Sequence, residues 1–198
     1  MPRKYALGKR AAQQADTRRR IIAAALELYQ EQGVSVTTML DIARRADVAP
    51  GTVANHFGSA AALATEVAGE LFGELRMPTP DLLDGVVGLR DRVDLLVREL
   101  SAFFDRAGPW WRAWQREGPG VPFWADAEAR YYQQLDALVR AALGPLSSDE
   151  DAVAVVITVL GRWVIGSLQE AGRTSEQAVS LVSDLLASWL ETRTPPVR

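Results

Sequence analysis

Apolar residues recur three and four positions apart along almost the whole chain, and the alternating pattern of β-strands is almost absent. This spacing is the period of an α-helix, in which such residues share one face. The chain has 198 residues, of which 48% are apolar, and can therefore bury a sizeable core. The sequence predicts an all-α protein built from several helices.

The composition excludes several kinds of site. The chain has no cysteine, and His56 is its only histidine. Disulfides and thiolate metal sites are therefore excluded, and one histidine is too few for a typical zinc or iron site. We expect neither a metal nor a cofactor.

No segment is typical of export or of a membrane span. The N-terminus is basic but lacks the apolar core of a signal peptide. The longest apolar run, residues 152–168, contains Thr158 and Arg162 and is short for a bilayer. We expect a soluble, cytoplasmic protein without membrane contact.

The net charge of −3 is distributed unevenly. Residues 1–57 contain nine Lys or Arg and five Asp or Glu, which gives +4 there and leaves −7 for the rest. A basic N-terminal part on an acidic remainder indicates a polyanionic partner. The alternative is a basic tail that is only solvated.

Helix boundary signals divide the first third of the chain. Asp16 or Thr17 can cap a first helix, which Gly33 ends as glycine often does. Thr38 begins a short second helix, with Asp41 three residues later in a capping-box pattern. A further helix is predicted from about Ser59.

Between the last two of these lies a third helix, from Pro50 to about Phe57. Two short helices joined by a tight turn form a helix-turn-helix. Asp47 suits that turn because aspartate tolerates the left-handed backbone. Val53 and Phe57 are one turn apart and would anchor the third helix. The outward residues are then Pro50, Gly51, Thr52, Asn55 and His56.

The segments "AALELYQEQGVSVTT", "DIARRADVAPGTV" and "NHF", followed by Leu63, together resemble the tetracycline-repressor (TetR) family of transcription regulators. The resemblance covers about residues 17–63, and its specificity lies in the combined spacing. It implies an N-terminal DNA-binding head of three helices. It also implies a helical body that dimerises and binds an inducer.

The resemblance assigns roles to single residues of the head. Thr38, Thr52 and His56 are expected to contact phosphate. Gly51 and Asn55 are the expected base readers, since asparagine can pair bidentately with adenine. Pro50 begins this recognition helix, and Arg44 or Arg45 is expected near the DNA backbone. For His56 the alternative is a helix-end histidine with a structural hydrogen bond. A catalytic role is disfavoured, because no catalytic set of serine, cysteine or carboxylate lies in the same stretch.

Three positions depart from the family pattern. Ala54 replaces a common aromatic residue, Ala60 replaces a common lysine, and Asp47 replaces the turn glycine. The aromatic residue and the lysine commonly touch DNA phosphates in the family, so their loss should weaken binding. We expect the basic start, from Arg3 to Arg20, to compensate as a flexible arm.

The break "MPTPD", residues 77–81, is the expected joint between head and body. We divide the chain into a basic arm (residues 1–15), a helix-turn-helix domain (16–60) and an effector-binding and dimerisation region (61–198). The helices predicted beyond the joint are residues 82–107, 109–117, 123–143, 148–171 and 175–192.

Aromatic residues concentrate in the predicted body. They form either an effector pocket, with a few polar groups that orient a guest, or ordinary core. If the interleaved acids Asp105, Glu117, Asp126 and Glu128 face inward, a cationic aromatic guest is favoured. The candidate ligand-binding residues are Phe103, Phe104, Trp110, Trp111, Trp114, Phe123, Trp124, Tyr131 and Trp163.

The last two predicted helices are unusually apolar. In the family they pair with their copies in a dimer, whereas the alternative is a monomer core. We predict a homodimer whose heads meet a palindromic operator about one DNA turn, roughly 34–36 Å, apart. A guest that changes the spacing of the heads would release the DNA.

The sequence thus predicts a ligand-responsive transcriptional regulator, most often a repressor in this family, that binds double-stranded DNA and a small apolar or amphipathic effector. The first alternative is a small-molecule-binding protein of this fold with weak or lost sequence-specific DNA binding. A small helical enzyme using the acids among the aromatic residues is the second alternative, and we do not expect an enzyme.

Overall fold

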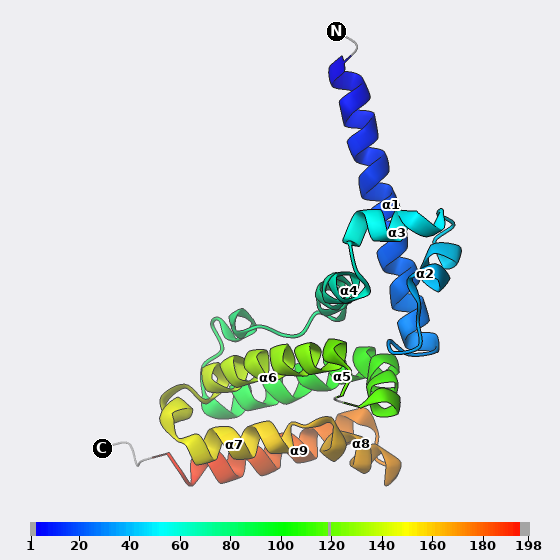
Figure 1. The fold of residues 1–198 in the computed structure, drawn as a ribbon. Helices are drawn as coiled ribbons and strands as arrows, with labels where there is room; N and C mark the ends of the chain where they lie inside the picture. The colour runs from blue at the N-terminus through cyan, green and yellow to red at the C-terminus, as the bar shows by residue number, and fades with distance from the viewer. Residues whose placement is uncertain (1–2, 119, 195–198) are drawn as a thin grey trace. The chain divides into compact units, whose positions relative to one another are not determined.

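The computed structural model describes residues 3–118 and 120–194, and for residues 3–7, 162 and 163 it describes the backbone alone. Within these ranges all regular structure is helical, as predicted (Figure 1). The helices are α1 (Arg3–Glu31), α2 (Met39–Arg45), α3 (Pro50–Phe57), α4 (Ala60–Leu75), η1 (Pro80–Leu83), α5 (Leu89–Glu117), α6 (Pro122–Leu143), η2 (Gly144–Ser148), α7 (Glu150–Val159), α8 (Arg162–Glu170) and α9 (Ser175–Glu191).

The chain divides into two compact units. The head unit contains Met1–Glu74 together with Pro109–Ala127, and the body unit contains Leu75–Gly108 together with Glu128–Arg198. A segment from the middle of the sequence, made of the end of α5 and the start of α6, therefore returns to the head. We call residues 109–127 the return segment.

Helix α1 starts much earlier than predicted, at Arg3 and not at Asp16. Residues 3–15 are mostly strong helix formers, and extending an existing helix needs no new nucleation. The Asp16 carboxylate does not cap the helix and pairs with Arg19 at 3.0 Å. Figure 1 shows the N-terminal half of α1 extending beyond the other helices of the head unit.

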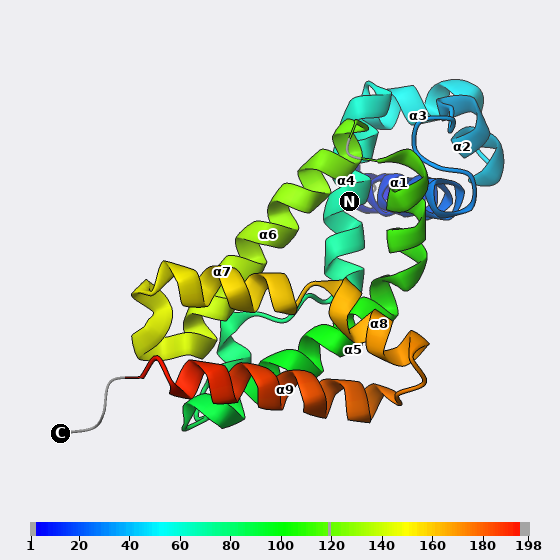
Figure 2. The same ribbon diagram turned by 90° about the horizontal axis from the view of Figure 1, so that it is seen from below.

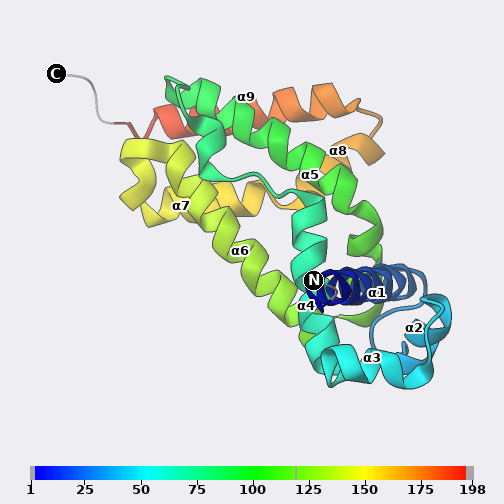
Figure 3. The same cartoon turned by 90° about the horizontal axis from the view of Figure 1, so that it is seen from above.

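The helix-turn-helix matches its prediction. Thr38 caps α2 in a capping box with Asp41, and Pro50 begins α3. Asp47 has a φ of 51°, in the left-handed region predicted for the turn. Val53 and Phe57 are buried. Helix α2 packs on both α1 and α3, and Figure 3, which looks almost along α1, shows both short helices beside it.

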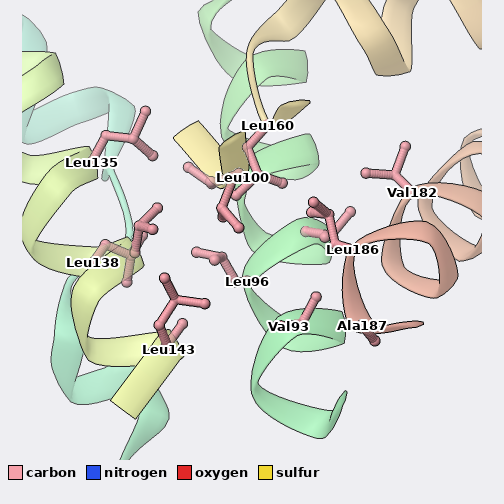
Figure 4. Close-up of a cluster of buried hydrophobic side chains, with 14 of the residues drawn as sticks. Val93, Leu96, Leu100, Leu135, Leu138, Leu143, Leu160, Val182, Leu186 and Ala187 are labelled. Atoms are coloured by element: carbon pink, nitrogen blue, oxygen red, sulfur yellow. The ribbon is translucent and has the colours of Figure 1, made fainter. Parts of the chain in front are cut away.

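The body unit has one apolar core, built from α5, α6, α7, α8 and α9. Figure 4 shows side chains of α5, α6 and α9, together with Leu160, in this core. Helix α9 packs along α7 and α8 (Figure 2). Its predicted range is confirmed to within one residue, and its Thr174 cap forms a second capping box with Gln177.

Several helix boundaries predicted beyond residue 81 are wrong. Helix α5 runs through Pro109, where two helices were predicted. Proline removes one helical hydrogen bond, but buried residues on both sides, Ala107 and Ala113, keep the helix packed. Helix α5 also begins at Leu89 and not at residue 82, because Gly85 and Gly88 both adopt positive φ.

The predicted helix 148–171 is interrupted at Leu160 and Gly161, which separate α7 from α8. A Cβ atom at position 161 would lie 3.1 Å from the Thr158 carbonyl oxygen, so glycine suits this break. By length and composition, Glu150–Glu170 would pass for a membrane span. Core helices share these features, and Val153, Val156 and Leu160 belong to the core of the body unit.

Candidate DNA-binding surface

Helix α3 presents small and polar residues to solvent. Pro50, Gly51 and Asn55 are exposed, while Thr52 and His56 are half-buried. A Cβ atom built on Gly51 meets no atom within 4 Å, so the backbone there is open to a partner. The five predicted outward residues therefore share one accessible helix, with the buried Val53 and Phe57 behind them.

Arg18 of α1 holds α3 in place. Its guanidinium lies 4.5 Å from the centre of the Phe57 ring and donates to the His56 carbonyl oxygen at 3.3 Å. It also forms an ion pair with Glu66 of α4. In the sequence Arg18 stands out only as one charge of the basic start, because its partners lie 38 and 48 residues away.

The two arginines of α2 differ in their surroundings. The Arg44 guanidinium is well exposed, and its contact with Asp41 is long, at 3.7 Å. Arg45 forms ion pairs with Glu27 at 2.9 Å and with Glu31 at 2.8 Å, both on α1. The hydrogen bond from Arg45 lowers the pKa of Glu31. Arg44 is thus open to a partner, while Arg45 fastens α2 to α1.

Thr38 is engaged within the head itself. Its hydroxyl oxygen accepts from the Asp41 N–H at 3.1 Å, and the Asp41 carboxylate accepts from the Thr38 N–H at 3.1 Å. The hydrogen bond from the Thr38 hydroxyl is the largest cause of the lowered pKa of Asp41. These contacts fix the start of α2, the element that precedes the turn and α3.

The basic residues of α1 do not form a flexible arm. Arg20 donates to the Ala46 carbonyl oxygen at 3.1 Å, beside the turn, and Arg19 pairs with Asp16. Lys9 and Arg10, nearer the N-terminus, are exposed and make no ion pair with the side chains that the structure describes. The side chains of Arg3 and Lys4 lie outside the described residues.

Residues of α1 and α3 line a groove of about 380 Å³. It is lined by Gln14, Ala15 and Arg18 of α1 and by Asn55 and His56 of α3. The candidate base reader Asn55 and the candidate phosphate contact His56 thus share a concave surface with one face of α1. Within the described part of the chain the His56 imidazole makes no hydrogen bond, and its carbonyl oxygen is the group that Arg18 binds.

The predicted aromatic cluster is divided between the two units. In the head unit, Phe123 and Trp124 are buried while the other three rings are half-buried. In the body unit, Phe103 lies 6.1 Å from Tyr131 in a stacked arrangement. The Trp163 side chain lies outside the described residues. The head unit holds Trp110, Trp111, Trp114, Phe123 and Trp124, and the body unit holds Phe103, Phe104 and Tyr131.

The acids among these rings do not form the inward-facing set that a cationic guest would need. Asp105 and Asp126 are exposed, and Glu128 is only half-buried. Glu117 is bound to the loop between α1 and α2, where its carboxylate accepts from Val34 N–H at 2.9 Å and Ser35 N–H at 2.7 Å. No sequence pattern predicts this role, since Glu117 lies 82 residues from Ser35 in the chain.

Comparison with known proteins places this head among bacterial regulators. Residues 21–67 match the model of the family described as bacterial regulatory proteins, tetR family. The chain is 30% identical over 198 residues to the HTH-type transcriptional regulator SrpR of Pseudomonas putida, across 95% of this chain and 91% of that protein.

Solved structures with the same fold include two regulators. A TetR-like transcriptional regulator from Rhodococcus sp. RHA1 gives a TM-score of 0.61 at 16% identity, with coverage of 90% of this chain and 97% of the other. NalD of Pseudomonas aeruginosa, the secondary repressor of the MexAB-OprM multidrug efflux pump, gives 0.57 at 21% identity, with coverage of 86% and 94%.

Proposed function

The chain belongs to the TetR family of bacterial transcriptional regulators, and we propose that it is a repressor that binds a palindromic operator as a homodimer. A small apolar or amphipathic effector would release the DNA. Repression is the common role in this family. The observation that carries the proposal is the exposed face of α3, which meets solvent with small and polar residues.

We assign the DNA contacts from that face. Gly51 allows the backbone to approach the major groove closely, and Asn55 can pair bidentately with adenine. Thr52, His56 and Arg44 are proposed phosphate contacts, which fix register and supply much of the affinity. For Thr38 and Arg45, the contacts within the head favour holding α2 over contacting DNA. Pro50 is proposed to lie at the groove as the first residue of α3.

Around this surface we retain residues 16–60 as the helix-turn-helix domain and residues 61–198 as the effector-binding and dimerisation region. Two parts of that region, residues 61–74 and the return segment, belong to the head unit. Within residues 1–15, proposed as an arm, the described residues 3–15 form the N-terminal part of α1, and we propose that this helix presents the exposed Lys9 and Arg10 to flanking DNA.

The proposed dimer interface lies on α9. Leu181 and Leu185 are one turn apart and are 50% and 61% exposed. Val155 of α7, a helix that packs on α9, is also exposed. A second copy would remove this apolar surface from water, which favours association. Two heads on one dimer then match the two halves of a palindrome.

We propose that the effector uses aromatic surface. The half-buried rings of Trp110, Trp111 and Trp114 in the head unit, and of Phe104 and Tyr131 in the body unit, offer apolar area to a guest. Because Asp105 and Asp126 are exposed, charge gives no support to a cationic guest. We infer that the protein binds ligands and does not catalyse a reaction, as is general in the family. We also infer that it acts in the cytoplasm, because its proposed DNA target lies there.

The first test is selection of binding sites from random duplex DNA with the purified full-length protein at near-physiological salt. Enrichment of a palindrome with half-sites one turn apart is expected. Asn55→Ala should then relax the preference at one base pair per half-site, with a cost of about 1–3 kcal/mol. A folded, dimeric protein that enriches no sequence would contradict the proposal.

That outcome would favour a second candidate, a small-molecule-binding protein of the same fold. The observation behind it is the pair Ala54 and Ala60, which lack the groups that touch phosphate in the family. Both positions are exposed alanines, so neither supplies a side-chain donor to a phosphate. This candidate predicts normal dimerisation with weak, sequence-independent DNA binding.

A further inference from the structure

Glu117 lies at the centre of a contact between the return segment and the loop that precedes α2. Among the described residues its carboxylate accepts four hydrogen bonds, of which three come from the loop between α1 and α2: Val34 N–H at 2.9 Å, Ser35 N–H at 2.7 Å and the Ser35 hydroxyl at 2.6 Å. The fourth comes from the indole Nε1–H of Trp124 at 2.7 Å. Bonds to an ionised acceptor are about twice as strong as neutral ones.

The loop is shaped to receive this carboxylate. Gly33 has a φ of +107°, and a Cβ atom there would lie 2.8 Å from Glu117 Oε1. The backbone conformation therefore favours glycine, and a larger residue would also have to displace the Glu117 carboxylate. Partial burial raises the pKa of Glu117, but the hydrogen bonds from Ser35, Val34 and Trp124 outweigh it, so its pKa lies below the ordinary value. The carboxylate is charged at neutral pH.

Other contacts of the return segment reach the same end of α1. Arg116 donates to the Gln30 carbonyl oxygen at 2.9 Å, and the Phe123 ring meets the Tyr29 ring edge-on at 5.5 Å. Burial, with a smaller effect of the nearby Glu117 charge, raises the pKa of Tyr29 to about 12. Tyr29 is thus neutral and packed, and Glu117 is the acceptor at the centre of the contact.

Three residues separate Ser35 from Met39, the first residue of α2. The position of this loop therefore determines where α2 begins, and α2 packs on α3. Thr37 Oγ1 closes the loop by donating to the Gly33 carbonyl oxygen at 2.6 Å. A change at Glu117 is passed to α2 through a short, hydrogen-bonded stretch of backbone.

We propose that Glu117 is a positioning residue for DNA binding. It holds the α1–α2 loop in the register that presents α3, and it couples the state of the return segment to operator affinity. This proposal rests on the proposed function. Trp124 shares the same carboxylate, so a ligand that displaces the Trp124 indole would alter the support of the loop. Because such coupling is reciprocal, operator binding must then also change the conformational equilibrium of residues 109–127.

The test uses Glu117→Gln in the full-length protein, with Asp126→Asn as the matched control. Asp126 is an exposed acid of the same segment and makes no hydrogen bond among the described side chains. Operator affinity is expected to fall about tenfold in Glu117→Gln, within the usual range of coupling between sites, and to stay unchanged in the control.

Hydrogen exchange separates positioning from mere stability. In the wild type, the selected operator duplex is expected to slow exchange in residues 33–37 and also in 109–127. In Glu117→Gln the effect on 109–127 should disappear, although the variant still binds DNA at higher concentration. An unchanged affinity, or an unchanged response of residues 109–127, would overturn the proposal.

If Glu117→Gln does not fold, Ser35→Ala and Trp124→Phe each remove one side-chain donor and keep the carboxylate. Each is expected to weaken operator binding several-fold, and wild-type affinity in both would overturn the proposal. If selection yields no operator, the proposed function fails and coupling to DNA fails with it. Hydrogen exchange in the free protein then still tests whether Glu117 holds the loop. If it does, residues 33–37 exchange faster in Glu117→Gln than in the wild type. Unchanged exchange would mean that Glu117 does not hold them.

Discussion

Asp47 occupies the turn between α2 and α3 with a φ of 51°, where the family commonly has glycine. The left-handed region is costly for residues with a Cβ atom, and aspartate tolerates it better than most. Asp47 is exposed, and its N–H donates to the Arg44 carbonyl oxygen at 3.3 Å. The turn therefore depends on this left-handed backbone conformation, which residue 47 has to adopt.

We predict that Asp47→Gly raises the free energy of unfolding by about 0.5–1 kcal/mol, because glycine adopts this φ without strain. Asp47→Ala is expected to lower it by a similar amount, since alanine lacks the polar side chain that eases the left-handed conformation. Urea denaturation of both variants measures these values. Equal stability of the glycine and alanine variants would show that the turn carries no strain.

A second prediction concerns Glu117 and pH. Its pKa in the folded state is lowered, whereas an unfolded glutamate has a pKa of about 4.3. Its contribution is therefore fully present above the unfolded pKa and is lost as the pH falls through the folded pKa. The wild type should exceed Glu117→Gln in free energy of unfolding by roughly 1 kcal/mol at pH 7, after discounting for solvent.

This difference should shrink as the pH falls below about 4, since a protonated glutamate resembles glutamine. Denaturant unfolding at several pH values between about 7 and 3 measures it. A difference that stays constant over this range would mean that the charge of Glu117 contributes nothing to the contact.

At the scale of elements, α3 and α4 carry alanines, Ala54 and Ala60, at two positions where the family commonly has side chains that touch phosphate. Ala60 is the first residue of α4 and is exposed. We predict that Ala60→Lys tightens operator binding about fivefold near 0.15 M salt. The plot of log binding constant against log salt concentration should become steeper by about 0.9, because one more phosphate is neutralised. Ala62→Lys adds the same charge on the opposite side of α4, and equal effects of both variants would exclude a local contact.

The extension of α1 is a preformed helix about 20 Å long, at 1.5 Å per residue over residues 3–15. Lys9 and Arg10 lie on it, exposed. We predict that deleting residues 1–12 weakens operator binding and makes the log–log salt dependence shallower by about 1–2, which is about one for each phosphate that is no longer neutralised. The double variant Lys9→Gln, Arg10→Gln keeps the helix and should reproduce most of the effect. Unchanged affinity and salt dependence in both would show that the extension does not meet DNA.

The proposed function of the whole molecule depends on dimerisation, and the proposed interface contains the exposed leucines of α9. We predict that Leu181→Glu combined with Leu185→Glu converts the dimer to a monomer at micromolar concentration, because two charges would be buried in an apolar interface. Light scattering gives the mass, and affinity for the palindrome should fall with it. Val87→Glu is the control, since Val87 is 84% exposed in a loop. A monomeric wild type, or a dimeric double variant, would contradict this interface.

Much of the helix-turn-helix could be read directly from the sequence. The Thr38–Asp41 capping box, the left-handed Asp47 and the start of α3 at Pro50 depend on neighbours within a few residues. The buried side of α3 follows from Val53 and Phe57, one turn apart. Local hydrogen bonding and helical period are properties of short segments, so these features are visible before any tertiary contact is known.

Features that depend on contacts between residues far apart in the sequence became visible only in the tertiary structure. Arg18 joins α3 and α4, and Glu117 joins the α1–α2 loop, across 38 to 83 residues of sequence. Helix α5 also continues through Pro109, because residues before and after the proline are packed in the interior. No local pattern encodes which charge meets which partner, because that depends on how the helices pack. The sequence by itself thus determined the helix-turn-helix and the outward face of α3, because these depend on short-range patterns, and the fold determined which residues hold that face in place.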